Sequence, residues 1–204
     1  MSSQYRAIAE PGCAQTRVLG SRFLGTAVRA NDAEEAMQLL EHEKRERHDA
    51  THWCYAVRHG FGAETVEKSS DAGEPHGTAG IPILREIQKR DLTNCLVIVT
   101  RYFGGTKLGT GNLARAYAEC AALALDASVV GIHEITVTVF VECGYDDQAV
   151  VYHVARRFQA DVELLPSSLR VEFRLRFAPE NVAAAMTALQ EESCGRIVVS
   201  ESPS

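Results

Sequence analysis

Apolar and polar positions alternate in some stretches of the chain and recur every three or four positions in others. Trp53, Tyr55 and Val57 alternate with their neighbours, as in a strand, whereas Ile83, Leu84 and Ile87 form the stripe of a helix. The pattern therefore predicts an α+β fold.

Strands and helices alternate through the first two thirds of the chain, after a segment (residues 1–16) that has little periodicity and is expected to be a loose or edge segment. The expected strands are 22–28, 53–57, 64–68 and 92–100, and the expected helices are 32–47, 82–89 and 113–126. Asp32 is a suitable N-cap with Glu35 reaching back, and Thr110 or Asn112 can cap the last of these helices. We expect residues 17–130 to form one domain.

The pattern changes after residue 134. Strands are expected over 135–142, 161–165, 169–177 and 196–200, and helices over 146–159 and 179–192. This βαββαβ order matches the ferredoxin-like unit. We therefore expect a second domain over residues 134–204.

The composition is that of an ordinary globular protein, with 204 residues, 46% hydrophobic and 24% charged. It excludes coiled coils, low-complexity disorder and disulfide scaffolds. The longest aliphatic run, Leu96–Val99, is far shorter than a membrane span, and the start does not resemble a signal peptide. Six scattered cysteines without a C-x-x-C motif indicate neither a zinc ribbon nor disulfides. We expect a soluble cytoplasmic protein.

The net charge of −6 excludes a uniformly basic nucleic-acid-binding surface but leaves room for a local basic patch. Arg170, Arg174 and Arg176 are expected to share one face of a C-terminal strand, with Phe140 outward nearby. Such a face can meet RNA or a protein partner. Because 6 basic and 11 acidic residues follow residue 133, a solvated face is favoured.

A polar, glycine-rich loop precedes the second helix. It carries Asp71, Glu74 and His76 among three glycines. Free N–H groups at the helix start could hold an anion or orient the carboxylates. The alternative is a long turn in which Asp71 only caps the helix.

A second glycine-rich loop, residues 101–111, lies at another strand-to-helix junction. Its glycines are accompanied by Arg101, Lys107 and the later Arg115, a combination that suits phosphate recognition. The loop has no Walker motif, and the acidic second strand of a dinucleotide-binding fold is missing. His48 and His52 have the spacing of helical metal ligands but straddle a helix–strand break, so no metal is expected.

Four phrases of the sequence together resemble the IMPACT/YigZ family. They are Ser21-Arg22-Phe23, Asp49-Ala50-Thr51-His52-Trp53-Cys54, the loop Asp71–Gly80, and the stretch from Arg101-Tyr102-Phe103-Gly104-Gly105 to Tyr117. The resemblance implies an N-terminal ribosomal-protein-like βαβ two-layer domain, similar to domain IV of elongation factor G, and a C-terminal domain similar to its domain V. Because eukaryotic relatives regulate translation, it also implies a translation-linked regulator.

The sequence departs from the family pattern at four positions. Ala72 replaces the second Asp of Ser-Asp-Asp-Gly-Glu-Pro, and Trp53 replaces a histidine. Asn112 stands where glycine is frequent, and Gly20 where lysine is. Losing a carboxylate and a histidine weakens any case for shared acid–base or metal chemistry there.

Our leading hypothesis is a non-enzymatic protein that contacts RNA, the ribosome or a translation factor through a basic cleft between the two loops. Tyr102 or Phe103 would stack on a base. The expected binding residues are Asp71, Glu74, His76, Arg101, Tyr102, Gly104, Gly105, Lys107, Gly109, Gly111 and Arg115. No catalytic residue, metal or cofactor is assigned.

Two other functions are compatible with the sequence. A small-molecule enzyme or binder could take a phosphorylated ligand in the same cleft, with Asp71 or Glu74 as base or metal ligand. An adaptor could instead bind a protein through the C-terminal sheet, where Arg174 and Arg176 would be required.

Overall fold

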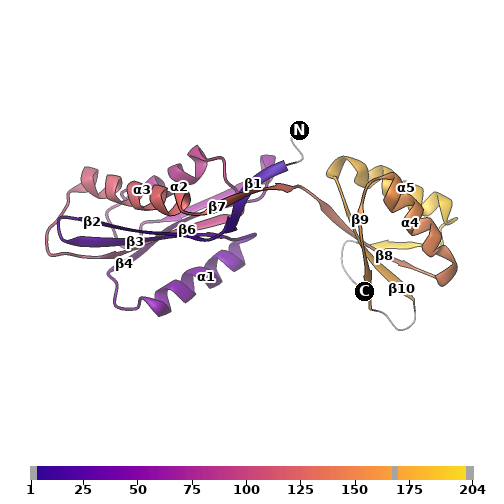
Figure 1. Cartoon of the computed structure of the whole chain (residues 1–204), viewed down its shortest axis with the longest axis horizontal. Helices are drawn as coiled ribbons and strands as arrows, with labels where there is room; N and C mark the ends of the chain where they lie inside the picture. The colour runs from indigo at the N-terminus through magenta and orange to yellow at the C-terminus, as the bar shows by residue number, and fades with distance from the viewer. Residues whose placement is uncertain (1–3, 167–169, 201–204) are drawn as a thin grey trace. The chain divides into compact units, whose positions relative to one another are not determined.

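The structure, a computed structural model, describes residues 4–166 and 170–200 (Figure 1). The chain divides into two compact units, one of residues Tyr5–His133 and one that begins at Glu134 and also includes Gln4. No described helix is long and apolar enough to cross a membrane.

The N-terminal unit is built on a five-stranded antiparallel-paired sheet of order β2-β3-β6-β4-β5. These strands are β2 (Gly12–Val18), β3 (Ser21–Arg29), β4 (His52–His59), β5 (Val66–Ser70) and β6 (Cys95–Tyr102). Both β3 and β4 run antiparallel to β6, so they are parallel to each other, and α1 (Ala33–Glu46) connects them. The result is a βαβ crossover with a third strand between its two strands.

Helices cover both faces of this sheet. The helices α2 (Gly80–Lys89) and α3 (Thr110–Asp126) lie on one face, and α1 lies on the other (Figure 1). Val97 and Val99 of β6 pack in the core under α2 and α3, whereas Leu96 and Ile98 pack under α1. The expected two-layer arrangement therefore needs a correction: β6 is apolar on both sides, and α1 adds a third layer.

From Gln4 on, the opening segment, expected to be loose or an edge, forms strands. Residues Gln4–Glu10 form β1, which pairs with β7 (Val129–Glu134), and β2 is an edge strand of the main sheet. Ala7 and Ile8 are fully buried. A side chain at Gly12 would collide with the α3 carbonyl of Ala124, so the strand passes directly against that helix. Gln15 and Arg17 point outward, whereas Thr16 is a polar residue on the inward side, so the strand pattern is hard to see in the sequence.

The start of α1 is capped as the sequence predicts, by residues next to it in the chain. The Glu35 N–H donates to Asp32 Oδ1 at 2.8 Å, and the Glu35 carboxylate accepts the Asn31 N–H at 2.8 Å. The expected capping of α3 by Thr110 or Asn112 is wrong. The N-cap is Gly109, at a φ of +76°, and no side chain of the described residues caps this helix.

The C-terminal unit has the predicted ferredoxin-like topology. Its strands are β8 (Val137–Cys143), β9 (Asp161–Leu165), β10 (Val171–Phe177) and β11 (Val198–Ser200), and its helices are α4 (Gln148–Arg157) and α5 (Val182–Glu192). The sheet order is β11-β8-β10-β9, with every pair antiparallel. Residue 169, the first of one expected strand, lies outside the described residues. The alternating pattern of β10 places Phe173, Leu175 and Phe177 in the core.

Candidate functional site

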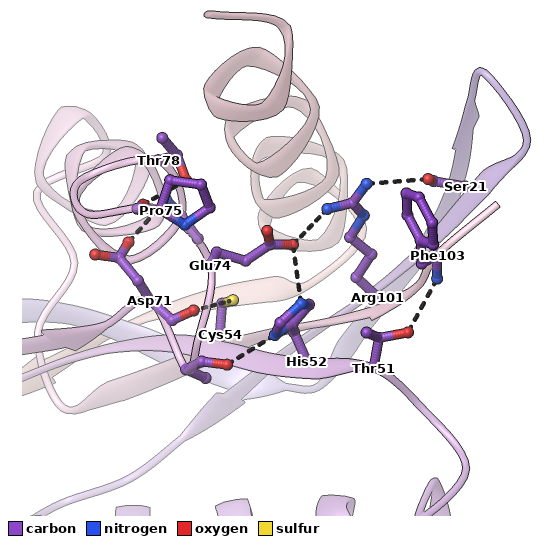
Figure 2. Close-up of polar contacts among 12 residues, drawn as sticks. Ser21, Thr51, His52, Cys54, Asp71, Glu74, Pro75, Thr78, Arg101 and Phe103 are labelled. Atoms are coloured by element: carbon purple, nitrogen blue, oxygen red, sulfur yellow. Dashed lines mark hydrogen bonds and ion pairs between the residues drawn. The ribbon is translucent and has the colours of Figure 1, made fainter. Parts of the chain in front are cut away.

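A buried ion pair joins the two glycine-rich loops. Arg101 Nη1 donates to Glu74 Oε1 at 2.6 Å, and the two side chains are 6% and 5% exposed (Figure 2). Arg101 Nη2 donates to Ser21 Oγ at 3.1 Å, and the same oxygen accepts the Gly104 N–H at 3.2 Å. Ser21 thereby fixes both the guanidinium and the start of the second loop.

Glu74 is also bonded to the helix behind it. The Tyr117 hydroxyl donates to Glu74 Oε1 at 2.8 Å, and His52 Nε2 lies 3.8 Å from the same oxygen. Since His52 Nδ1 lies 2.8 Å from the carbonyl oxygen of Ala72, Nδ1 carries the proton in the neutral ring (Figure 2). His52 is thus hydrogen-bonded within the protein.

Two further hydroxyl or thiol groups beside this network stay protonated. Burial raises the pKa of the Cys54 thiol to about 12, and its Sγ–H donates to the Asp71 carbonyl oxygen at 3.0 Å. Burial also raises the pKa of the Tyr117 hydroxyl. Neither group supplies an anionic nucleophile at neutral pH.

Asp71 shapes the first loop and the start of α2. Its carboxylate accepts the N–H groups of Gly77 (2.8 Å), Ala79 (2.9 Å) and Gly80 (2.8 Å). Burial opposes the charged form, but these three bonds outweigh it and lower the pKa of Asp71. The capping alternative is therefore what the structure shows. His76 is fully exposed, with Nδ1 at 3.8 Å from Asp71 Oδ2.

Glycine is required at one point of the second loop. The backbones of Gly104 and Gly20 are in direct contact, and a Cβ at Gly104 would collide with the Gly20 backbone. The contact ties the β2–β3 turn to the loop after β6. Gly20 itself has a φ of +83°, a backbone conformation that glycine adopts without strain, so glycine also suits this position.

A pocket of about 430 Å³ opens between the loops. Its polar floor is Glu74, Arg101 and His52, and its remaining lining is mostly apolar. The other lining residues are Thr51, Pro75, Phe103, Lys107, Leu108, Gly109, Thr110 and Leu113. Four of the expected binding residues, Glu74, Arg101, Lys107 and Gly109, therefore meet in one place.

The other expected binding residues do not line this pocket. Asp71, His76, Gly104, Gly105, Gly111 and Arg115 lie outside its lining. Tyr102 lies on the opposite face of the sheet, where its hydroxyl donates to Asp49 Oδ1 at 3.0 Å and Arg22 covers its ring at 4.2 Å. Tyr102 is thus not available for stacking in the cleft. Phe103, 47% exposed, is the aromatic residue of the pocket.

The expectation of a basic cleft also needs correction. Glu74 neutralises Arg101, and the exposed Arg115 keeps its charge but does not line the pocket. Within the described part of the chain, Lys107 is exposed and makes no ion pair, so it supplies the available positive charge of the pocket.

The arginines of the C-terminal sheet are balanced in the same way. Arg170 pairs with Glu142 at 3.1 Å, Arg174 with Glu163 at 3.0 Å, and Arg176 with Asp161 at 3.7 Å.

Among residues 4–166 and 170–200, no three His, Cys, Asp or Glu side chains gather as metal ligands would.

Several residues of the site cannot be recognised as site residues from the sequence pattern around them. Ser21 and Tyr117 stand in the phrases that resemble a family, but nothing local links them to Arg101 or Glu74. Leu108 and Leu113 shape the apolar wall of the pocket, and their spacing resembles that of any helix start.

Comparison with known proteins adds relatives along most of the chain. A family model described as the Impact N-terminal domain matches residues 19–125. An IMPACT family member of Haemophilus influenzae is 31% identical over 183 residues, covering 88% of this chain and 87% of that protein. One of Thermus thermophilus, "IMPACT family member in pol 5'region", is 36% identical over 182 residues and covers 88% of this chain and 97% of that protein.

Two further matches differ in extent. The IMPACT family member YvyE of Bacillus subtilis is 39% identical over 117 residues, which span 57% of this chain and 54% of YvyE. A crystal structure titled as that of a hypothetical protein superposes with a TM-score of 0.72 at 24% identity, covering 98% of this chain and 97% of the other. This last similarity concerns the fold alone.

Proposed function

The chain belongs to the IMPACT family, and we propose that it is a translation-linked regulatory protein that binds RNA through the pocket between its two glycine-rich loops. The resemblance to translation-regulating relatives supports the biological setting. The observation that carries the RNA proposal is that an exposed aromatic ring and an unpaired cation, Phe103 and Lys107, lie on the same pocket.

Lys107 and the start of α3 form the proposed phosphate subsite. The first hydrogen bond within α3 runs from the Leu113 N–H to the Gly109 carbonyl oxygen at 2.9 Å. The N–H groups of the preceding turn therefore lack intrahelical partners and carry the positive end of the helix dipole. A phosphate oxygen there would gain both these donors and the Lys107 ammonium.

Phe103 forms the proposed base subsite. The Arg101 guanidinium carbon lies 5.4 Å from its ring centroid, so a buried cation holds the ring in place. Stacking of a base on an exposed aromatic ring is worth about 1–3 kcal/mol and tolerates any base. The subsites therefore suit an unpaired nucleotide more than a duplex.

Binding is proposed rather than catalysis because the site's ionisable groups satisfy one another. Glu74 is occupied by Arg101 and Tyr117, and Asp71 is occupied by three backbone N–H groups. The Cys54 thiol stays protonated. The carboxylates and the thiol therefore serve to hold a preformed surface.

Co-sedimentation with ribosomes and with free single-stranded RNA, at salt from about 50 to 200 mM, tests the proposal. We expect binding that weakens with salt and falls further in Lys107→Ala. Lys68→Ala is the matched control, because Lys68 is exposed on β5 and makes no ion pair in the described chain. Absence of RNA binding at the lowest salt would contradict the proposal.

The pocket volume favours one second candidate, a phosphorylated small molecule in the same subsites. About 430 Å³ lies within the roughly 300–1,000 Å³ typical of small-ligand sites. Thermal unfolding with a panel of mononucleotides tests it. A rise in Tm that is lost in Lys107→Ala, in a protein that does not bind RNA, would favour this candidate.

A further inference from the structure

The turn between β2 and β3 exposes a leucine in a strained conformation. Val18 pairs with Ser21, so Leu19 and Gly20 form a two-residue turn, with φ values of +46° and +83°. Two positive φ values are typical of a type I′ turn, whose first position favours Asn, Asp or Gly. Leu19 is also 59% exposed. Neither conformation nor burial therefore explains a leucine here.

Backbone contact places this turn beside the pocket loop. Gly20 and Gly104 touch, and their chain neighbours are Leu19 and Phe103. Phe103 is 47% exposed and Leu19 59%. Leu19 and Phe103 are together called the apolar tip. Its two members come from different loops but are fixed by one contact.

Cations lie on both sides of the apolar tip, with Arg17 and Arg22 on the sheet face away from the pocket and Lys107 on the pocket side. Arg17 and Arg22 stand directly opposite each other across the hairpin, which is unfavourable for like charges unless an anion joins them. Arg17 is exposed and has no ion pair among the described residues, and Arg22 lies over the Tyr102 ring. Lys107 follows Phe103 in its loop. An apolar surface bordered by cations suits bases and their flanking phosphates.

We infer that the apolar tip packs against unpaired RNA bases, with Leu19 as a wedge beside the base stacked on Phe103. This inference rests on the proposed RNA-binding function and names the part of the RNA that is recognised. Apolar side chains between bases are a known means of holding unstacked nucleic acid. Arg17 and Arg22 contact the phosphates that pass the wedge on the sheet face away from the pocket, and Lys107 contacts those on the pocket side.

The variant Leu19→Asn separates this role from folding. Asn is favoured in the left-handed conformation of the turn, so we expect Tm to rise by about 2–4 °C. We also expect the affinity for a labelled single-stranded oligouridine to fall about fivefold or more. The matched control is Leu123→Gln, which removes another exposed leucine about 20 Å along α3 from the helix start. Its affinity for RNA should equal that of the wild type.

The outcomes distinguish the inference from the proposed function. If Leu19→Asn is stable and binds oligouridine as the wild type does, while Lys107→Ala binds more weakly, the wedge is wrong and the RNA site stands. Equal wild-type affinity for oligouridine and a blunt RNA duplex of the same length would also overturn the wedge. If the wild type binds neither RNA, the proposed function fails together with the inference.

Discussion

Arg101 Nη1 lies 2.6 Å from Glu74 Oε1, and this buried pair connects two loops that are 27 residues apart in the chain. Each member has a further fixed partner, Ser21 for the arginine and Tyr117 for the glutamate. The pair sets the floor of the pocket and removes one cation from the surface. The available positive charge of the pocket is then Lys107, and the proposed RNA binding depends on that residue.

Removing either member of the pair is expected to leave a buried charge without its partner. Arg101→Met should therefore lower the free energy of unfolding by about 3–5 kcal/mol. The double variant Arg101→Met/Glu74→Gln should recover part of this loss. Urea unfolding followed by circular dichroism measures both values.

The matched control for this experiment is an exposed ion pair of α1. Lys44 Nζ lies 2.7 Å from Glu41 Oε1, with both side chains well exposed. Lys44→Met should change the unfolding free energy by less than about 1 kcal/mol. Arg101→Met with an effect no larger than that of Lys44→Met would show that the pair does not fix the loops.

Asp71 should make the unfolding free energy of the N-terminal unit depend on pH in the acidic range. The pKa of Asp71 is lowered in the folded state, so its stabilisation is present above its unfolded pKa of about 3.9 and is lost as pH falls through the folded value. Asp71→Ala should cost about 1–2 kcal/mol at pH 7. The difference in unfolding free energy between Asp71→Ala and the wild type should become smaller below about pH 4. A difference that stays constant from pH 7 to pH 2.5 would rule out this linkage.

Ala72 occupies a backbone position that suits another residue. Its φ is +45°, in the left-handed region, and its side chain is exposed. Because Asn and Asp adopt the left-handed region more readily than Ala, Ala72→Asn should raise the unfolding free energy by about 0.5–1 kcal/mol. The control Ala127→Asn, exposed at a φ of −80°, should bring no gain. Equal effects of the two substitutions in thermal unfolding would contradict the conformational explanation.

The sequence predicts those features that depend on neighbouring residues. Asp32 caps α1 as expected because the cap and its partner Glu35 are three positions apart. The strands of the ferredoxin-like unit can be predicted because apolar and polar residues alternate strictly along them. In β10, for example, Phe173 and Leu175 point into the core. The sequence pattern predicts that β6 ends at residue 100, which leaves Tyr102 in the following loop. The strand continues to Tyr102, and period-two alternation then sends that side chain to the far face.

The site itself depends on contacts that no local pattern reveals. Ser21 and Arg101 are 80 residues apart, and Glu74 and Tyr117 are 43 apart. A sequence shows the two glycine-rich loops and their charges, but not which charge neutralises which. Arg101 therefore resembles a free cation in the sequence and is a buried structural residue in the fold.

The most direct test of the account is the salt dependence of oligouridine binding by the wild type, Lys107→Ala and Lys68→Ala, measured by fluorescence anisotropy. Each phosphate contact contributes about 0.7 to the slope of log K against log salt for a single strand. We predict that Lys107→Ala binds more weakly at low salt and has a slope smaller by about 0.7, whereas Lys68→Ala matches the wild type. Identical slopes and affinities for all three proteins would contradict RNA binding at this pocket.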